Sequence, residues 1–211
     1  MSASKALTAL DFQEIAGVSR ETLGRLGVYA ELLRKWNRAI NLVAADSLED
    51  LWRRHMLDSS QLAPLLPAGG LRIADLGSGA GFPGLVLAIL GCGEVHLVES
   101  DRRKAQFLRE VSRETAAAAQ VHPSRIEDLS PLSAAVVVAR GLAPLDRLLD
   151  YVARHLAPGG QALLPKGQDW ERELAAARAR WRFAVQVHPS RTHAQGRLQG
   201  RILAISALER R

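Results

Sequence analysis

Apolar side chains recur at helical spacing within the first sixty residues of the chain. The repeating positions are Leu23, Leu26, Ala30, Leu33 and Ile40. Because charged residues lie mostly on the other faces, this pattern predicts an amphipathic helix. A second, short helix is expected near residue 46, where Ser47-Leu48-Glu49-Asp50 resembles a capping box. Clustered Pro and Gly at 64–70 then mark a junction, which predicts a helical cap over residues 1–66 and a main domain over residues 67–211.

After residue 70, short apolar runs alternate with helical stretches. The predicted strands are Leu71–Leu76, Glu94–Val98, Gln120–Pro123, Ala135–Ala139 and Gly160–Pro165. The predicted helices cover residues 82–91, 102–119 and 144–156. This alternation is typical of a doubly wound α/β fold with a parallel sheet. A helix near 169–180 follows, and we expect the last two strands, Trp181–His188 and Arg201–Ala207, to add an antiparallel pair at the sheet edge.

Composition limits the class of protein. The 211 residues are 47% hydrophobic and 24% charged, which is ordinary for a globular domain. The longest apolar runs, such as residues 85–90, are too short to cross a bilayer, and the first 30 residues contain no signal-peptide core. A single cysteine, Cys92, excludes an internal disulfide and a Cys-rich zinc site. We therefore expect a cytoplasmic protein with no membrane segment and no metal.

The net charge of +6 comes from one part of the chain. Basic and acidic residues balance up to residue 160, whereas residues 161–211 hold 10 basic and 4 acidic side chains. Clustered cations favour a polyanionic partner such as nucleic acid. The alternative is an Arg-rich surface that serves only solubility.

The stretch Ala74–Gly84 is a glycine-rich loop that follows a predicted strand and begins a predicted helix. Its glycines permit positive φ and bring the backbone close to a ligand. Glu99 comes about 20 residues later, at the end of the next strand, where an acidic residue can bind ribose hydroxyls. A nucleoside-containing cofactor is the simplest occupant, although such a loop can also occur without a ligand.

Two cofactors fit this loop. The last three glycines have the G-x-G-x-x-G spacing of dinucleotide-binding proteins, which is a weak match on its own. S-adenosylmethionine fits better, because Asp75 could serve its ammonium group, directly or through water, and Glu99 its ribose diol. The antiparallel last strand also favours a methyltransferase over a dehydrogenase. The cofactor-binding residues predicted from this reasoning are Asp75, Gly77, Ser78, Gly79, Gly81 and Glu99.

The segment after the fourth predicted strand bears on the acceptor. It contains Arg140 and lacks the Asn/Asp-Pro-Pro-aromatic motif used to methylate exocyclic amines. Cys92 follows the first helix of the main domain, away from the expected site, so a thiolate mechanism is disfavoured. A fixed cation suits an acceptor that needs no deprotonation, such as guanine N7. The alternative is that Arg140 only pairs with Asp146 or Glu127.

Several motifs together resemble one family. They are Lys35-Trp36-Asn37, Ile40-Asn41-Leu42, residues 54–59, 75–84, 99–103 and 125–128, Ala139-Arg140, and residues 158–160 and 165–167. They are similar to the glucose-inhibited division protein B family, the bacterial 16S rRNA guanine-N7 methyltransferases. The resemblance implies a seven-stranded, Rossmann-like class I methyltransferase sheet, S-adenosylmethionine as donor, and 16S rRNA or the small ribosomal subunit as partner.

The resemblance also assigns residues. By matching position, the cofactor would be contacted by Gly77, Phe82, Ile126, Glu127 and Arg140. Family positions tied to RNA or activity correspond to Asn41, Arg102, Arg103, Lys166 and Arg201, and the candidate catalytic residues are Asn41 and Arg140. We expect a monomer. Two other functions stay open: an RNA-binding assembly factor with a vestigial donor pocket, and a methyltransferase for small molecules.

Overall fold

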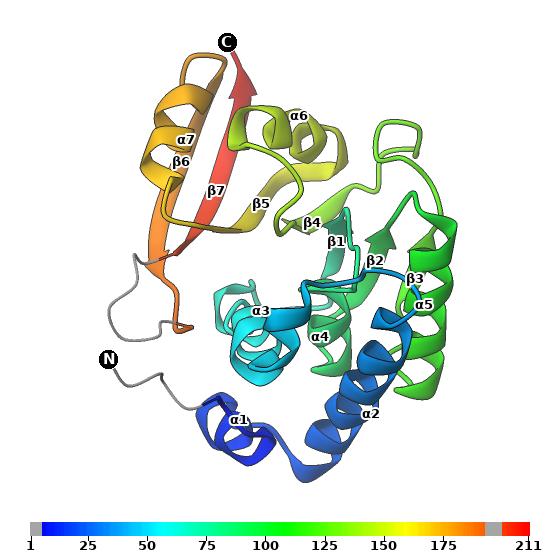
Figure 1. Ribbon diagram of the computed structural model, residues 1–211. Coiled ribbons are helices and arrows are strands. Elements are labelled where there is room, and N and C mark those ends of the chain that lie inside the picture. The colour runs from blue at the N-terminus through cyan, green and yellow to red at the C-terminus, as the bar shows by residue number, and fades with distance from the viewer. Residues whose placement is uncertain (1–5, 193–199) are drawn as a thin grey trace.

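The computed structural model describes residues 6–192 and 200–211, which build one seven-stranded sheet between two layers of helices (Figure 1). The strands are β1 (Arg72–Leu76), β2 (Glu94–Val98), β3 (Gln120–His122), β4 (Ala134–Val138), β5 (Leu156–Lys166), β6 (Trp181–Pro189) and β7 (Arg201–Arg210). Their order is β3-β2-β1-β4-β5-β7-β6, and β7 is antiparallel to both of its neighbours. The prediction of a doubly wound sheet whose last strand is antiparallel is confirmed.

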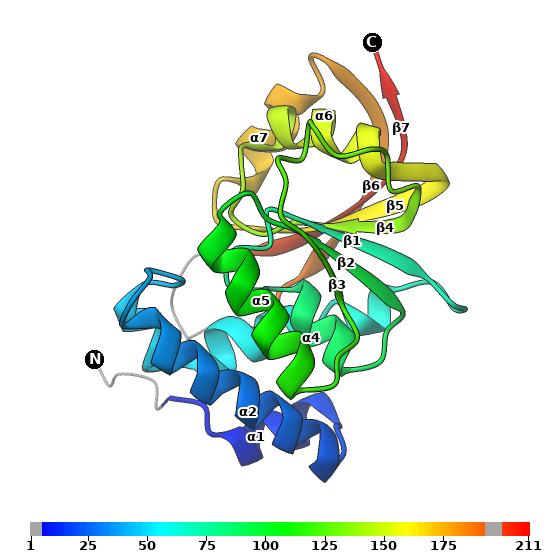
Figure 2. The same cartoon turned by 90° about the vertical axis from the view of Figure 1, so that its right-hand side faces the viewer.

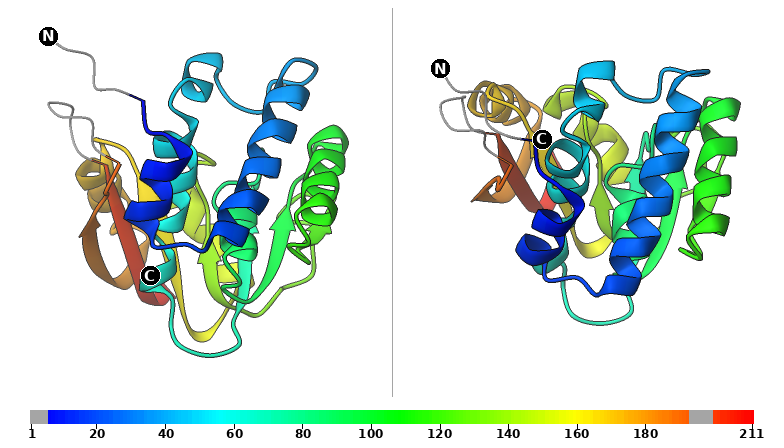
Figure 3. Two further views of the ribbon diagram at one scale, coloured as in Figure 1. Left: turned by 90° about the horizontal axis from the view of Figure 1, so that it is seen from below. Right: turned by 60° about the horizontal axis from the view of Figure 1, so that its bottom comes forward.

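The helices lie on both faces of the sheet (Figures 2 and 3). They are α1 (Ala9–Ala16), α2 (Arg20–Asn37), α3 (Asp58–Ser60), α4 (Gly84–Ile89), α5 (Arg102–Glu114), α6 (Leu145–His155) and α7 (Trp170–Ala177). A π-helical turn, Trp52–Leu57, leads into α3, and 3₁₀ turns cover Ala45–Leu48 and Ala63–Leu65. The helices α1 to α5 cover one face and α6 and α7 cover the other (Figure 2).

Alternating strand residues feed two apolar cores. Ile73 belongs to the core under the N-terminal helices, together with Phe12 and Tyr29. Ala74 belongs to the core on the other face, together with Leu148 of α6. A strand buried on both faces needs apolar residues at successive positions, which explains the unbroken apolar run in β4. The N-terminal helices and the sheet share the first core, and the division at residues 66 and 67 stays a prediction.

The predicted helix over residues 102–119 ends at Glu114 instead. Ala116 and Ala118 have φ values of 48° and 52°, so the alanine run is not helical. Long-range bonds explain the difference: Arg25 donates to the carbonyls of Thr115 at 2.6 Å and Ala116 at 2.9 Å. These contacts outweigh the high intrinsic helix propensity of alanine. They join α2 to the end of α5, and the two helices lie side by side (Figure 3).

The predicted capping box near residue 47 is also wrong. The Ser47 hydroxyl donates to the Ala44 carbonyl at 2.6 Å, and this 3₁₀ turn has no side-chain cap. A capping box occurs at α1 instead, where the Thr8 hydroxyl and the Asp11 carboxylate each bind the backbone N–H of the other residue. In the described part of the chain, no helix is long and apolar enough to span a bilayer.

Candidate functional site

The glycine-rich loop connects β1 to α4 and is fixed to the end of β2. Gly77, Gly79 and Gly81 all have positive φ, between 54° and 94°. The Ser78 backbone N–H donates to the Val98 carbonyl at 3.0 Å, and the Gly79 N–H donates to Glu99 Oε2 at 2.9 Å. The loop therefore presents its backbone at the carboxyl ends of β1 and β2, the edge where ligands bind in sheets of this type.

A cavity of about 440 Å³ opens above this loop. Of the predicted cofactor-binding residues, those that line it are Gly77, Ser78, Gly79, Phe82, Glu99, Ile126, Glu127 and Arg140. An added Cβ at Gly77 would lie 2.5 Å from Leu142 Cδ1, whereas at Gly79 the nearest atom would be the Gly77 carbonyl oxygen at 3.8 Å. The backbone at Gly79 therefore faces open space, which a ligand can approach closely.

The Glu99 side chain is held at the cavity wall by two backbone N–H groups. Besides the bond from Gly79, its Oε1 accepts the Asp101 backbone N–H at 2.7 Å, and the residue is only 9% exposed. Each carboxylate oxygen has room for a second donor. Glu99 can therefore accept hydroxyl groups from a ligand in the cavity without giving up the bonds that orient it.

Asp75 lies beneath the loop and does not line the cavity. It is fully buried, and its Oδ2 accepts the Gly84 backbone N–H at 3.0 Å. Burial raises the pKa of this carboxyl to about 7. Its Oδ1 has no hydrogen-bond partner within the described residues. An unpartnered buried oxygen suits a ligand cation or a bridging water, although the direct ammonium contact stays a prediction. Gly81, likewise predicted as a contact, does not line the cavity, and its backbone packs against Leu85 and Tyr29.

Arg140 follows β4 and is held by the N-terminal part of the chain. Its Nη1 donates to Asp58 Oδ2 at 2.9 Å and to the Arg54 carbonyl at 3.0 Å. Its Nη2 lies 2.8 Å from His55 Nδ1, and the guanidinium carbon lies 5.0 Å from the centre of the Phe82 ring. The cation is therefore fixed at the cavity wall before any ligand binds.

The alternative partners considered for Arg140, Asp146 and Glu127, are wrong. The ion pair is made with Asp58 instead. The Glu127 carboxylate lies 3.9 Å from Arg125, and its side chain is 50% exposed. The sequence distance between residues 58 and 140 hid this pair, because only the fold brings the start of α3 next to the end of β4.

His55 is neutral, and its hydrogen bonds define its tautomer. Burial, and then the nearby Arg140 cation, lower the pKa of His55 to about 3. Arginine can only donate, so His55 Nδ1 accepts from it. The Ser47 hydroxyl gives its proton to a carbonyl, so it accepts from His55 Nε2 at 2.8 Å. The uncharged ring also stacks on Phe82 with centroids 4.7 Å apart.

Phe82 forms part of the cavity wall in an aromatic stack. Its other close ring is Tyr29 of α2, with centroids 5.1 Å apart, and the Tyr29 hydroxyl donates to the Ala80 carbonyl at 2.5 Å. This ring and hydroxyl tie the N-terminal helices to the glycine-rich loop. The segment after α2 contributes directly as well, because Leu42 and Val43 line the cavity.

Sequence reasoning assigned no separate role to several residues that build the site. Asn37 Oδ1 accepts the backbone N–H groups of Leu42 and Val43 at 2.8 and 2.9 Å, which shapes that wall. His155 Nε2 donates to the Ile126 carbonyl at 2.9 Å and holds the loop after β3. Asn37 and Asp58 lie within the sequence motifs quoted for the family resemblance, and these motifs were the signal that could have identified them. Nothing in the local sequence indicated His155.

The predicted RNA-binding residues fall into two groups. Arg102 and Arg103 are exposed at the start of α5, between Ser100 and Lys104, which line the cavity. Asn41 is exposed in the segment after α2, and it does not line the cavity.

Lys166 and Arg201 form the second group and line a separate cavity of about 290 Å³. Lys166 is mostly buried, and its Nζ donates to Glu173 at 2.7 Å and to the Ala143 carbonyl at 3.0 Å. Arg201 lies over the Trp170 ring at 5.9 Å. These two cations are neighbours, since Lys166 and Arg201 are paired across β5 and β7.

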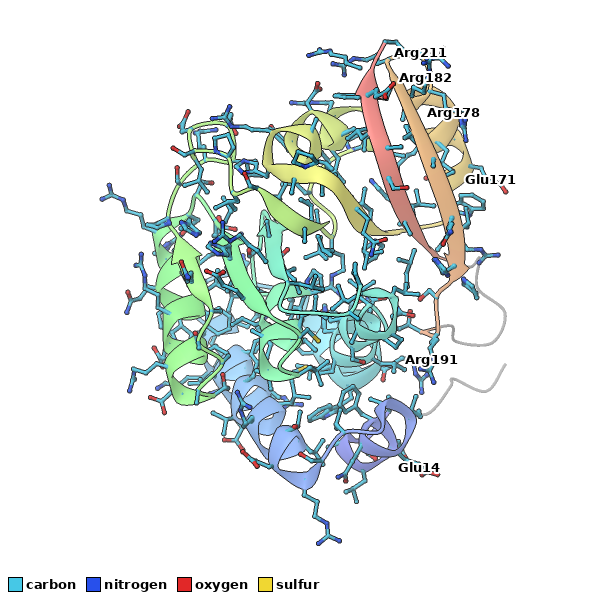
Figure 4. The ribbon with its side chains drawn as sticks, turned by 180° about the vertical axis from the view of Figure 1, so that it is seen from behind. Glu14, Glu171, Arg178, Arg182, Arg191 and Arg211 are labelled. Atoms are coloured by element: carbon cyan, nitrogen blue, oxygen red, sulfur yellow. The ribbon has the colours of Figure 1, made fainter. Side chains whose placement is uncertain are left out.

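The basic last quarter of the chain is divided between two ends of the sheet. Arg178, Arg182 and Arg211 lie together at one end of β6 and β7 (Figure 4). The strand register puts Lys166 and Arg201 at the opposite end, since Arg201 pairs with Pro189 at one end of β6 and Arg210 with Trp181 at the other. Only part of the excess positive charge therefore lies near the two cavities.

The site fits a nucleoside with a cationic side chain better than a dinucleotide. Glu99 offers a fixed acceptor, and Gly79 presents open backbone. Nearby, Asp75 has a buried oxygen that no other described residue hydrogen-bonds. A loop made for a pyrophosphate would instead direct its N–H groups at an anion, whereas the Gly79 N–H is taken by a carboxylate. Within the described residues, no group of three or more His, Cys, Asp or Glu could hold a metal ion.

The sheet order, the antiparallel β7 and this loop define an S-adenosylmethionine-dependent methyltransferase of class I. A solved structure with this fold is the *M. jannaschii* TYW2 in complex with AdoMet, with a TM-score of 0.55 and 14% identity, covering 80% of this chain and 78% of that one. The GidB family, described as rRNA small subunit methyltransferase G, matches residues 23–201. The chain belongs to this family.

Curated relatives agree with the family match. Ribosomal RNA small subunit methyltransferase G of *Rhodospirillum centenum* is 58% identical over 190 residues, covering 90% of this chain and 88% of the relative. The protein of that name from *Paramagnetospirillum magneticum* is 56% identical over 181 residues, covering 86% and 88%. The expected enzyme class and its donor, S-adenosylmethionine, are confirmed.

Proposed function

We propose that this chain transfers the methyl group of S-adenosylmethionine to N7 of a guanine in the 16S rRNA of the small ribosomal subunit. Family membership supports rRNA as the substrate class. The observation that carries the choice of N7 is Arg140, a cation fixed at the carboxyl end of β4 by Asp58 and His55. Arg140 supplies positive charge at this position and cannot accept a proton. The neighbouring His55 is neutral and hydrogen-bonded at both nitrogens, so it is not placed to take a proton from the acceptor either.

An N7 acceptor needs no general base. The N7 lone pair forms a bond to the methyl carbon, the carbon–sulfur bond breaks with its electrons going to sulfur, and no proton leaves guanine. Catalysis then depends on holding two reactants in line and on fixed charges. Cys92 cannot act as a nucleophile here, because it precedes β2 at the amino end of that strand, opposite Glu99, and burial raises the pKa of its thiol.

Donor binding depends on the residues that line the larger cavity. Glu99 would accept from the ribose hydroxyls, Gly77 and Gly79 would let the donor approach the backbone, and Ile126 and Glu127 would hold the adenine. The bound donor supplies an electrophilic methyl group on a sulfonium. Phe82 and Arg140 close the wall toward the acceptor, and the aromatic stack with His55 keeps both in place.

RNA contacts come from cations around the cavities. Arg102 and Arg103 bind phosphates from the exposed start of α5, while Lys166 and Arg201 act at the smaller cavity. Asn41 contacts the RNA substrate from the exposed segment after α2. Such contacts mostly position RNA, and a base in folded rRNA must be extruded to reach the donor. One chain carries the full donor site, so we further propose a monomer that acts in the cytoplasm.

Methylation of small subunits from a strain that lacks this gene tests the proposal. Purified protein with labelled S-adenosylmethionine should transfer label to 16S rRNA, and borohydride–aniline treatment followed by primer extension should locate a single cleaved guanine. If deletion-strain subunits that were never incubated with the protein show the same cleavage after borohydride–aniline treatment, the assignment is refuted. Saturable donor binding without transfer to RNA would favour a small-molecule substrate, and no donor binding would favour an assembly factor.

A further inference from the structure

The smaller cavity contains a carboxylate as well as cations. Asp58 lines it together with Arg140, Lys166, Arg201 and Thr192. It shares Arg140 and Gly141 with the larger cavity, so the two spaces meet at the carboxyl end of β4. A base held where the two cavities meet could therefore present one edge to a donor in the larger cavity and its other edge to the smaller cavity.

The Asp58 carboxylate is rigidly placed. Its Oδ2 accepts from Arg140 at 2.9 Å, and its Oδ1 accepts from Gln61 Nε2 at 3.0 Å and more weakly from the Thr192 hydroxyl at 3.4 Å. The side chain is 17% exposed, so it is reachable from the cavity although mostly buried. A carboxylate has about four acceptor positions, so the three bonds named leave one position free. The long Thr192 bond can give way to a second ligand donor.

We propose that Asp58 is the residue that selects guanine, by accepting hydrogen bonds from N1–H and the N2 amino group of the extruded base. This inference rests on the proposed function. In guanine, N7 and O6 form one edge and the N1–H and N2 donors lie across the ring. When N7 faces the donor, the N1–H and N2 groups therefore point away from it and toward the smaller cavity.

The charges around the cavity match this orientation. Lys166 uses two of its three ammonium protons on Glu173 and Ala143, which leaves one for O6 of a base. Adenine carries an amino group where guanine carries O6 and lacks both donors that Asp58 would bind. The cavity thus pairs an acceptor with the guanine donors and a cation with the guanine acceptor, and it leaves adenine unmatched on both sides.

The test replaces one group of the base. Small subunits are reconstituted with 16S rRNA that carries inosine at the methylated position, introduced by splinted ligation. Inosine keeps N7, O6 and N1–H and lacks only the 2-amino group. We expect kcat/KM of the wild-type protein to fall about 10-fold or more with inosine, since a hydrogen bond to a charged acceptor is lost. A wild-type guanine-to-inosine ratio within about twofold of one would overturn the inference, whatever the variants do.

The variant Asp58→Asn separates reading of the base from support of Arg140. We expect a lower rate with guanine and a guanine-to-inosine ratio reduced to about threefold or less. A lower rate with the wild-type ratio would mean that Asp58 only positions Arg140, and it would overturn the inference. S-adenosylhomocysteine affinity, measured on each variant, reports any change in the donor site.

The matched control is Glu173→Gln, which removes a carboxylate from Lys166 but does not line the cavity. It should keep the wild-type guanine-to-inosine ratio, and a loss equal to that of Asp58→Asn would overturn the specific role of Asp58. The proposed function fails separately, if the wild-type protein transfers no methyl group to guanine N7 of natural subunits.

Discussion

Asp75 should give the unfolding free energy a pH dependence that one isosteric substitution removes. Burial raises the pKa of this carboxyl from 3.8 to about 7, against the opposing hydrogen bond from the Gly84 backbone N–H. The folded protein therefore binds this proton more tightly than the unfolded chain does. The resulting stabilisation is present below about pH 4 and is lost as the pH rises toward about 7.

The magnitude follows from the shift. A change of about three pKa units corresponds to about 4 kcal/mol, since each unit is worth about 1.4 kcal/mol. Titration of the unfolded carboxyl has already removed part of this by pH 5. The remaining loss between pH 5 and pH 8 is about 2–3 kcal/mol.

Urea unfolding of wild-type protein and Asp75→Asn, without donor, measures this difference. The amide can still accept from the Gly84 N–H but does not titrate, so the wild type should lose about 2–3 kcal/mol relative to the variant from pH 5 to pH 8. His122 and His155 have lowered pKa values, chiefly through burial, and they act in the opposite direction in both proteins. Asp128→Asn, at an exposed site, should retain the wild-type profile. Parallel profiles for wild type and Asp75→Asn would refute the reasoning.

Three further predictions concern the site. Glu99→Gln should weaken S-adenosylhomocysteine binding about 10-fold or more by calorimetry, because ribose hydroxyls lose a charged acceptor. Arg102→Ala with Arg103→Ala should lower rRNA affinity and reduce the slope of log affinity against log salt by about 1.5, with donor affinity retained. Tyr29→Phe should lower the unfolding free energy by about 1–3 kcal/mol in urea, because the buried Ala80 carbonyl loses its donor.

Matched controls exist for these changes. Glu31→Gln, on an exposed position of α2, should leave donor affinity as it is; an equal effect of both glutamine variants would remove Glu99 from the ribose. Arg182→Ala with Arg211→Ala removes the same charge at the far end of the sheet (Figure 4), and an equal loss of salt dependence would disprove the RNA face at α5. Unchanged stability of Tyr29→Phe would contradict the buried hydroxyl bond.

The sequence predicted most of the sheet because short, mainly apolar segments alternate with helical stretches along the main domain. Strand β5 is longer than predicted, Leu156–Lys166 rather than Gly160–Pro165. Pro158 and the following glycines read locally as a turn. The sheet nevertheless extends through them, with a register shift between Ala134 and Val136 that pairs β4 with residues on both sides. Such an irregularity depends on the neighbouring strand and has no signature in the segment itself.

The candidate site was predictable where its residues lie close together in sequence. The glycine-rich loop carries its own signal, and Glu99 lies at a known distance from it. The partners of Arg140 and Lys166 could not be predicted, because Asp58 and Glu173 meet them only through the fold. Charge counting also failed to show that the arginines of the last quarter divide between two ends of the sheet, since only the strand register separates them.

The position of β7 makes this protein sensitive to truncation. Strand β6 is synthesised before β7, and among the described strands β7 is its one neighbour and separates it from β5. A chain that stops before Arg201 therefore loses one strand by deletion and leaves a second without any neighbour. It also loses Arg201 from the wall of the smaller cavity. Premature termination there should therefore abolish methyltransferase activity, even though every residue that lines the donor cavity has already been synthesised.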